Sequence, residues 1–134
     1  DWRRVMAVNL DGAFLTLAAS LRAMEHGGGR VVVVSSVTGI KPVAGIGPYG
    51  VAKAGVAHMA RIAALESAAN GGEDFQQSVA AIGREATMKA MAKTTPSGRF
   101  ATSEEMADTI LYLLSDAASN ITGHVMVSDG GYTL

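Results

Sequence analysis

The feature that most constrains the fold is a run of four valines, Val31 to Val34, which ends in Ser35 and Ser36. Valine is β-branched and favours strands, and an apolar run without alternation is typical of a parallel strand covered on both faces. We therefore expect an α/β fold in which Arg30 to Ser36 is a central strand. Ligands of open α/β sheets bind at the carboxyl ends of such strands, which places Ser35 and Ser36 at a candidate site.

A long helix is expected before this strand. Apolar residues recur at helical spacing from Asp1 to about Glu25, and Asp1 is well placed to cap the first turn. The pattern is apolar on more than one side, so one face should pack on the sheet and the other on a second subunit. The glycine run at 27–29 follows a helix and precedes a strand, so it predicts a turn and not a phosphate-binding loop.

The valine run is followed by a loop and a second long helix. Residues 37–48 contain many glycines and prolines and predict an irregular loop. The helix should begin at about Pro48, whose fixed φ suits a first helical position, and continue through Leu65. Ser67 to Gly72 should break it.

The last part of the chain contains weaker patterns. Residues 76–93 favour a helix over a weak strand at 78–82, and residues 94–98 predict a loop. A capped helix should start at Ser103 and end near Ser115. A strand running into a glycine turn is expected over 123–131.

Composition limits the classes of function. The 134 residues fit one domain, and 49% hydrophobic residues, 17% charged residues and a net charge of −1 predict a folded chain without a nucleic-acid or anionic-membrane partner. The apolar runs are too short to span a bilayer and the start resembles no signal peptide, so a soluble chain is expected. With no cysteine, disulfides, thiolate metal sites and cysteine nucleophiles are excluded, and this absence, together with the many small residues, predicts a cytoplasmic location. His26, His58 and His124 lack ligand spacing, so no metal site is predicted.

Tyr49 and Lys53 carry the clearest chemical signal. They are four residues apart and would share one face of a helix. A phenol, with a pKa of about 10, is a weak acid or base at neutral pH, but a neighbouring ammonium favours the phenolate. Ser36 is placed to donate a hydrogen bond to the same substrate oxygen, so the three groups would protonate and stabilise the alkoxide that forms when a carbonyl accepts hydride. Tyr-x-x-x-Lys alone is a weak motif, and its weight comes from the strand, loop and helix around it.

Five ordered stretches together form a specific pattern: Val8 to Gly12, Gly29 to Gly39, Tyr49 to Gly55, Gly98 to Phe100 with Ser103 to Glu105, and Leu114 to Gly131. The pattern resembles the short-chain dehydrogenases/reductases, most closely their 3-oxoacyl-[acyl-carrier-protein] reductase-like branch. The resemblance implies the carboxyl-terminal part of a Rossmann-type doubly wound parallel sheet. It also implies an NAD(P)-dependent oxidoreductase, using NADP or NAD, that interconverts a ketone or 3-oxoacyl group and a secondary alcohol, and that forms a homotetramer.

The resemblance also implies a role for each site residue. Tyr49 would be the general acid/base and would contact substrate and cofactor, and Lys53 would bind the nicotinamide ribose and activate the tyrosine. Ser36 would orient the substrate carbonyl, and Asn9 would hold a proton-relay water. Ser35 would line the cofactor pocket.

Two departures from the family pattern predict an incomplete domain. The chain starts at Asp1 without a methionine, and the family's amino-terminal half, with its pyrophosphate loop and the residue that selects NAD or NADP, is absent. After Glu66 the family's Pro-Gly pair is missing, so we expect an omitted segment near 66–73 of a partial Rossmann-type domain that spans 1–134. The alternatives are a truncated, non-catalytic remnant that only associates with other subunits, and another activity of the family such as an epimerase or dehydratase.

Overall fold

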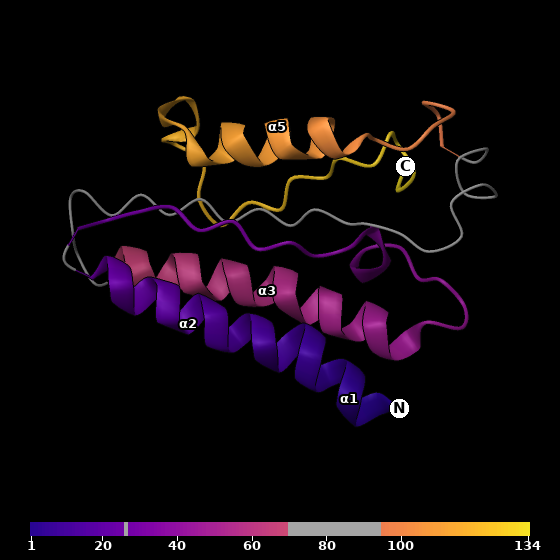
Figure 1. Cartoon of the computed structure of the whole chain (residues 1–134), viewed down its shortest axis with the longest axis horizontal. Coiled ribbons are helices and arrows are strands. Elements are labelled where there is room, and N and C mark those ends of the chain that lie inside the picture. Colours follow the sequence, from indigo (N-terminus) through magenta and orange to yellow (C-terminus); the bar gives the residue numbers. More distant parts are fainter. Residues whose placement is uncertain (26, 70–94) are drawn as a thin grey trace.

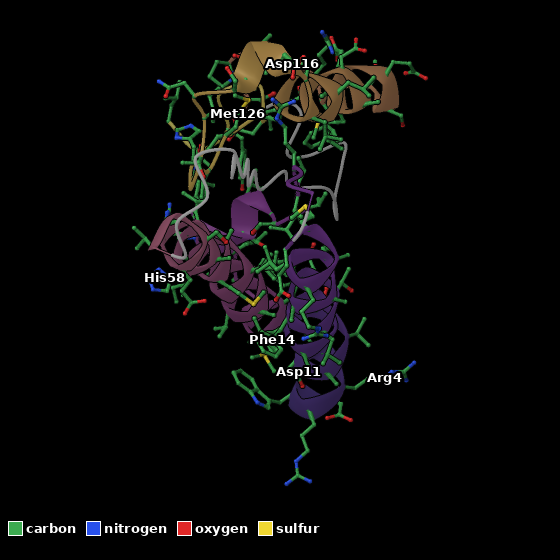
Figure 2. The ribbon with its side chains drawn as sticks, turned by 90° about the vertical axis from the view of Figure 1, so that its left-hand side faces the viewer. Arg4, Asp11, Phe14, His58, Asp116 and Met126 are labelled. Atoms are coloured by element: carbon green, nitrogen blue, oxygen red, sulfur yellow. The ribbon has the colours of Figure 1, made fainter. Side chains whose placement is uncertain are left out.

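Three layers make up the described part of the chain, which is residues 1–25, 27–69 and 95–134 of the computed structural model (Figure 1). Two long helical runs lie side by side in one layer, extended segments cross the middle, and α5 (Ser103–Leu114) covers the opposite side. Figure 2, turned by 90°, shows the same order of layers. The extended segment between the two helical runs is antiparallel to both of them, as a strand between two helices is in α/β folds.

The first helical run confirms the helix predicted before the valines. It consists of α1 (Trp2–Met6), the π-helical turn η1 (Ala7–Asp11) and α2 (Gly12–Met24). Asp1 caps it as predicted, because its carboxylate accepts a hydrogen bond from the Arg3 N–H over 3.1 Å. The glycine run ends it, since the Gly28 N–H donates to the carbonyl of Met24 and Gly28 has a φ of 64°, which glycine adopts at low cost.

The second helical run, α3 (Gly47–Ala69), follows a single 3₁₀ turn, η2 (Val37–Gly39). Pro48 lies in its first turn, as the sequence predicts. The predicted break at 67–72 is wrong for residues 67–69, which remain helical because serine and alanine are compatible with a helix and Ser67 is buried. The rest of that range lies outside the described residues.

Small residues let the two helical runs pack closely. A Cβ on Gly55 would lie 2.9 Å from Leu10 Cδ1, so the glycine makes room for the leucine of the facing helix. The inward face of α3 is largely alanine, and its buried apolar residues are Ala52, Val56, Ala57, Ala60, Ala63 and Ala64. This close packing agrees with the alanine-rich and glycine-rich sequence of α3.

The strands predicted for 30–36 and for 123–128 are wrong within the described ranges, where neither segment forms a β-ladder. Both segments run extended between the helical layers (Figure 1). Val34 is 45% exposed, so the expected burial on both faces does not occur among the described residues. A strand is defined by backbone hydrogen bonds to a neighbour about 4.8 Å away, and valine content alone supplies no such partner. The predicted glycine turn at 129–131 is confirmed.

Helix α5 begins with a capping box. The Thr102 hydroxyl accepts a hydrogen bond from the Glu105 N–H, and the Glu105 carboxylate accepts one from the Thr102 N–H. The predicted helix is therefore confirmed, with its cap one residue earlier than Ser103. The turn η3 (Asp116–Ala118) follows, and Arg30 joins this end to the extended segment by donating to the Leu114 carbonyl and the Asp116 carboxylate.

The first helical run is unusually apolar on its outside. Val8, Phe14 and Leu15 are exposed, which matches the second apolar face predicted from the sequence. By length and composition, Trp2–Met24 would be long enough to cross a membrane, with a mean hydropathy of 1.2, which differs from the expectation that the apolar runs are too short. Core helices of soluble proteins can have the same length and hydropathy, so these two properties are weak evidence for a membrane span.

Some predictions lie outside the described residues. These are the helix favoured over 76–93, its alternative strand at 78–82, and part of the omitted segment expected near 66–73.

Candidate functional site

Ser36 stands where the extended segment turns into η2. Its backbone is extended, with φ −148° and ψ 151°, and its hydroxyl caps the turn by accepting a hydrogen bond from the Thr38 N–H over 3.2 Å. The Gly39 N–H donates to the Ser36 carbonyl over 2.9 Å. The serine is therefore fixed at the end of the extended segment, as the sequence predicts.

Two glycines bring the loop into direct contact with α3. A Cβ on Gly39 would lie 2.7 Å from Ala54 N and 2.8 Å from Lys53 C, distances that real Cβ atoms do not show. A Cβ on Gly50 would lie 3.0 Å from the Thr38 carbonyl oxygen. The turn after Ser36 therefore packs on the first turns of α3, which carry the tyrosine and the lysine.

Hydrogen bonds in both directions fasten Lys53 to the extended segment. The Ser35 hydroxyl donates to the Lys53 carbonyl over 2.6 Å, and the Lys53 ammonium donates to the Val34 carbonyl over 3.2 Å. Ser35 and Ser36 are both buried. The side chain of Lys53 is thus held at the carboxyl end of the valine run.

Tyr49 lies one turn before Lys53 on α3. The Lys53 Nζ is 5.7 Å from the centroid of the Tyr49 ring, within the range of a cation–π interaction. Burial lowers the pKa of Lys53 below its ordinary value of 10.5, because the ammonium loses part of its hydration. The structure therefore places Ser35, Ser36, Tyr49 and Lys53 around one end of the extended segment.

Asn9 occupies the middle of the π-helical turn η1. Its Nδ2 donates to the Val5 carbonyl over 3.1 Å. In the part of the chain that the structure describes, its side chain is bonded to its own helix and not to Ser36, Tyr49 or Lys53. The turn packs against α3 through Leu10, and π-helical turns often occur at functional sites.

A shallow hollow opens beside the two serines. It lies between the turn after Ser36, α3 and the carboxyl-terminal extended segment, and its lining residues are Ser35, Ser36, Val37, Ile40, Ala57, Val125, Val127 and Ser128. The sequence did not predict the last three as site residues, and their only signal was their place at the end of a predicted strand. Within the described ranges no group of three or more metal-ligating side chains comes together.

Thr38 is a further residue of the site that the sequence did not predict. Its Oγ1 hydroxyl donates to the Ser36 Oγ over 2.9 Å, in addition to the backbone bond between the same two residues. The signal that could have found it is a hydroxyl residue two positions after Ser36, a spacing typical of local side-chain turns.

Models of known families match nearly the whole chain. Residues 1–81 match the model described as short chain dehydrogenase, and residues 74–133 match the model described as Enoyl-(Acyl carrier protein) reductase. Both matches agree with the resemblance to the short-chain dehydrogenases/reductases that the sequence motifs indicate.

Curated relatives and solved structures agree with these matches. A cis-4-hydroxycyclohexanecarboxylate dehydrogenase of Sinomonas cyclohexanicum is 40% identical over 98% of this chain and 56% of its own length. A 3-oxoacyl-[acyl-carrier-protein] reductase of Aquifex aeolicus is 35% identical over 98% of this chain and 56% of its own length. The chain thus spans about half the length of the curated relatives it matches.

The fold is shared with solved members of the same group. The crystal structure of an enoyl-[acyl-carrier-protein] reductase (NADH) from Aquifex aeolicus matches 99% of this chain and 55% of its own, with a TM-score of 0.84 and 26% identity. A short chain dehydrogenase from Leptospira borgpetersenii, solved with bound NAD+, matches 100% of this chain and 57% of its own, with a TM-score of 0.85 and 23% identity. The helices and extended segments therefore follow the Rossmann-type arrangement, and the chain belongs to the short-chain dehydrogenase family.

Proposed function

We propose that the full-length protein is an NAD(P)-dependent oxidoreductase that interconverts a ketone or 3-oxoacyl group and a secondary alcohol. The observation that carries this proposal is the position of the Lys53 ammonium, 3.2 Å from the Val34 carbonyl oxygen and 5.7 Å from the centroid of the Tyr49 ring. It puts a cation beside the tyrosine ring at the carboxyl end of the extended segment, and ligands of α/β folds bind at the carboxyl ends of the corresponding strands. Family membership and relatives named for dehydrogenation of cyclic alcohols and reduction of 3-oxoacyl groups support the same chemistry.

In the proposed reaction Tyr49 is the general acid/base. Its phenol gives a proton to the oxygen of a carbonyl being reduced, or its phenolate takes one from the hydroxyl of an alcohol being oxidised. The Lys53 ammonium lies beside the Tyr49 ring, and Ser36 donates a hydrogen bond to the same substrate oxygen. When bound, the nicotinamide supplies the hydride to the carbonyl carbon or accepts it from the alcohol carbon.

The donor groups fit the nicotinamide end of such a cofactor. An ammonium has three N–H donors, and in the described structure Lys53 uses one of them for Val34, which leaves two for the ribose hydroxyls. Ser35 donates its only proton to the Lys53 carbonyl and keeps acceptor capacity toward the pocket. We assign NADP or NAD to these residues, and we assign no described residue to the adenosine end.

Asn9 is proposed to hold a water that connects the site to solvent. Its Nδ2 is bonded to Val5, so its Oδ1 is the group that would accept a hydrogen bond from that water. The π-helical turn that carries Asn9 packs on α3 at Gly55, two residues after Lys53, which supports this role.

The test is a comparison of Tyr49→Phe with wild-type full-length protein. Turnover is followed by nicotinamide absorbance, with cyclohexanol and NAD+ or NADP+, and with acetoacetyl thioester and NADH or NADPH. Loss of the phenol should lower kcat by a factor of about 100 or more, while cofactor affinity from nicotinamide fluorescence stays unchanged. Tyr112→Phe, an exposed tyrosine on α5, is the matched control and should keep full activity. Full turnover in Tyr49→Phe contradicts the assignment.

A non-catalytic subunit that acts through association is the second candidate. The exposed Val8, Phe14 and Leu15 favour it, since an apolar helix face needs a partner. Such a protein would assemble without changing nicotinamide fluorescence. The proposed enzyme should assemble as a homotetramer, measured by light scattering, and should also change nicotinamide fluorescence. An epimerase or dehydratase of the family would bind the cofactor without a net change in its absorbance.

A further inference from the structure

Ser36 Oγ is the acceptor of two hydrogen bonds from one residue. The Thr38 N–H donates to it over 3.2 Å, and the Thr38 Oγ1 hydroxyl donates to it over 2.9 Å. Ser36 is 4% exposed, so water competes little for these bonds.

This pairing determines what the serine hydroxyl can still do. A serine oxygen has two acceptor positions and one proton. The Thr38 hydroxyl donates to Ser36 Oγ, and it has no other hydrogen-bond partner among the described residues. With the N–H and the hydroxyl of Thr38 both donating, both acceptor positions of Ser36 are filled and its own proton remains for donation to another group.

We propose that Thr38 is a positioning residue that holds the Ser36 hydroxyl as a hydrogen-bond donor toward the substrate oxygen. The inference rests on the proposed function. An oxygen that gains negative charge during reduction is stabilised by donors that already point at it, so a serine that turned its proton toward Thr38 would lose this effect.

Thr38 is itself anchored to the helix that carries the tyrosine. Its carbonyl oxygen would be 3.0 Å from a Cβ on Gly50, the residue after Tyr49. The same turn is pressed on α3 through Gly39. Thr38 therefore connects the orientation of Ser36 to the turn of α3 that carries Tyr49.

The decisive variant is Thr38→Val in the full-length protein. Valine has nearly the shape of threonine and keeps the backbone N–H, but it removes the hydroxyl donor. We expect kcat to fall about five- to tenfold and KM to change less than about twofold, because the lost bond matters most when charge develops on the substrate oxygen. Thr38→Ser keeps the donor and should recover most of the rate. Thr109→Val, which removes a hydroxyl donor on exposed α5, is the matched control and should leave kcat unchanged.

A double-variant cycle separates positioning from a structural effect. If Thr38 acts through Ser36, Thr38→Val should cause no further loss in a Ser36→Ala background. Two results overturn the inference. One is a wild-type kcat in Thr38→Val, which would mean that the Thr38 hydroxyl does not orient the Ser36 proton. The other is an equal loss of kcat with and without the Ser36 hydroxyl.

Failure of the proposed function gives a different result. If the wild type turns over no alcohol or ketone with either nicotinamide cofactor, the proposed function is contradicted, and the hydroxyl pair is judged by urea unfolding. Ser36→Ala and Thr38→Val should then shift the unfolding free energy by less together than the sum of their separate shifts. Additive shifts contradict the pairing.

Discussion

The Lys53 ammonium donates a hydrogen bond to the Val34 carbonyl over 3.2 Å, which holds a cation of α3 at the end of the extended segment. The same Nζ lies 5.7 Å from the centroid of the Tyr49 ring. One ammonium therefore contacts both the end of the extended segment and the aromatic ring of the first turn of α3.

The first prediction is that Lys53→Met weakens binding of the nicotinamide cofactor by the full-length protein. Methionine keeps an aliphatic stem but has no N–H donor for the ribose hydroxyls, so the Kd of the cofactor should rise about tenfold. Lys53→Arg keeps charged N–H donors and should lose less affinity. Nicotinamide fluorescence measures both variants, and a wild-type Kd in Lys53→Met contradicts the proposed role of the ammonium.

The second prediction concerns Gly39, which allows the loop to touch α3. In Gly39→Ala the new methyl group would meet backbone atoms of Lys53 and Ala54 at under 3 Å, and backbone cannot move aside as a side chain can. We expect the unfolding free energy to fall by about 1–3 kcal/mol, with a loss of turnover as Ser36 moves away from α3. Gly47→Ala, where a Cβ meets nothing within 4 Å, is the control and should change stability by less than about 0.5 kcal/mol in urea unfolding. Equal stability of the two variants would show that the contact is not tight.

The helices could be predicted from the sequence because their signals are local. Asp1 caps the first helix, Pro48 lies in the first turn of α3, and a capping box starts α5, each within one or two residues of the expected position. Spacing also predicted that Tyr49 and Lys53 share a face. These signals depend on neighbours within one or two turns, so they can be recognised without knowing which distant segments the helix will contact.

The strand and the finer parts of the site could not be predicted in the same way. The valine run indicates a buried, extended segment, but a ladder also requires a partner whose position the run does not encode, and Val34 is exposed in the described structure. The π-helical turn around Asn9 has no composition signal of its own. Thr38 was missed because its role depends on the side-chain rotamer that directs its hydroxyl to Ser36.

The third prediction concerns the fastening of the loop to the carboxyl-terminal turn. The Lys41 ammonium donates to the Tyr132 carbonyl over 2.6 Å and lies 4.6 Å from the centroid of its ring. The turn is rigid because the Asp129 carboxylate accepts hydrogen bonds from the N–H groups of Gly131 and Thr133. Lys41→Met keeps the aliphatic stem but loses both interactions, so the unfolding free energy should fall by about 1 kcal/mol.

A control for this variant is Arg4→Met, which removes an exposed cation that points away from the helices (Figure 2). It should change the unfolding free energy by less than about 0.5 kcal/mol. The ring contribution is measured with Tyr132→Leu, which keeps the backbone carbonyl. If Lys41→Met unfolds at the same urea concentration as the wild type, the loop is not held by this contact.

The last prediction concerns the acid dependence of stability at the start of α5. The pKa of Glu105 is lowered from 4.5 to about 2, first by its hydrogen bonds from the Arg99 guanidinium and then by the Thr102 N–H. A lowered pKa means that the folded chain binds this proton less tightly than the unfolded chain, so the stabilisation is present above pH 4.5 and is lost as the pH falls toward about 2. Glu105→Gln keeps the capping box but removes the charge, so its urea midpoint should lie below that of the wild type at neutral pH and approach it in acid. Because the pair is exposed, added salt should shrink the difference, and Asp108→Asn on the same helix serves as the control. A difference between wild type and Glu105→Gln that stays constant from neutral pH to acid would show that the carboxylate charge does not contribute.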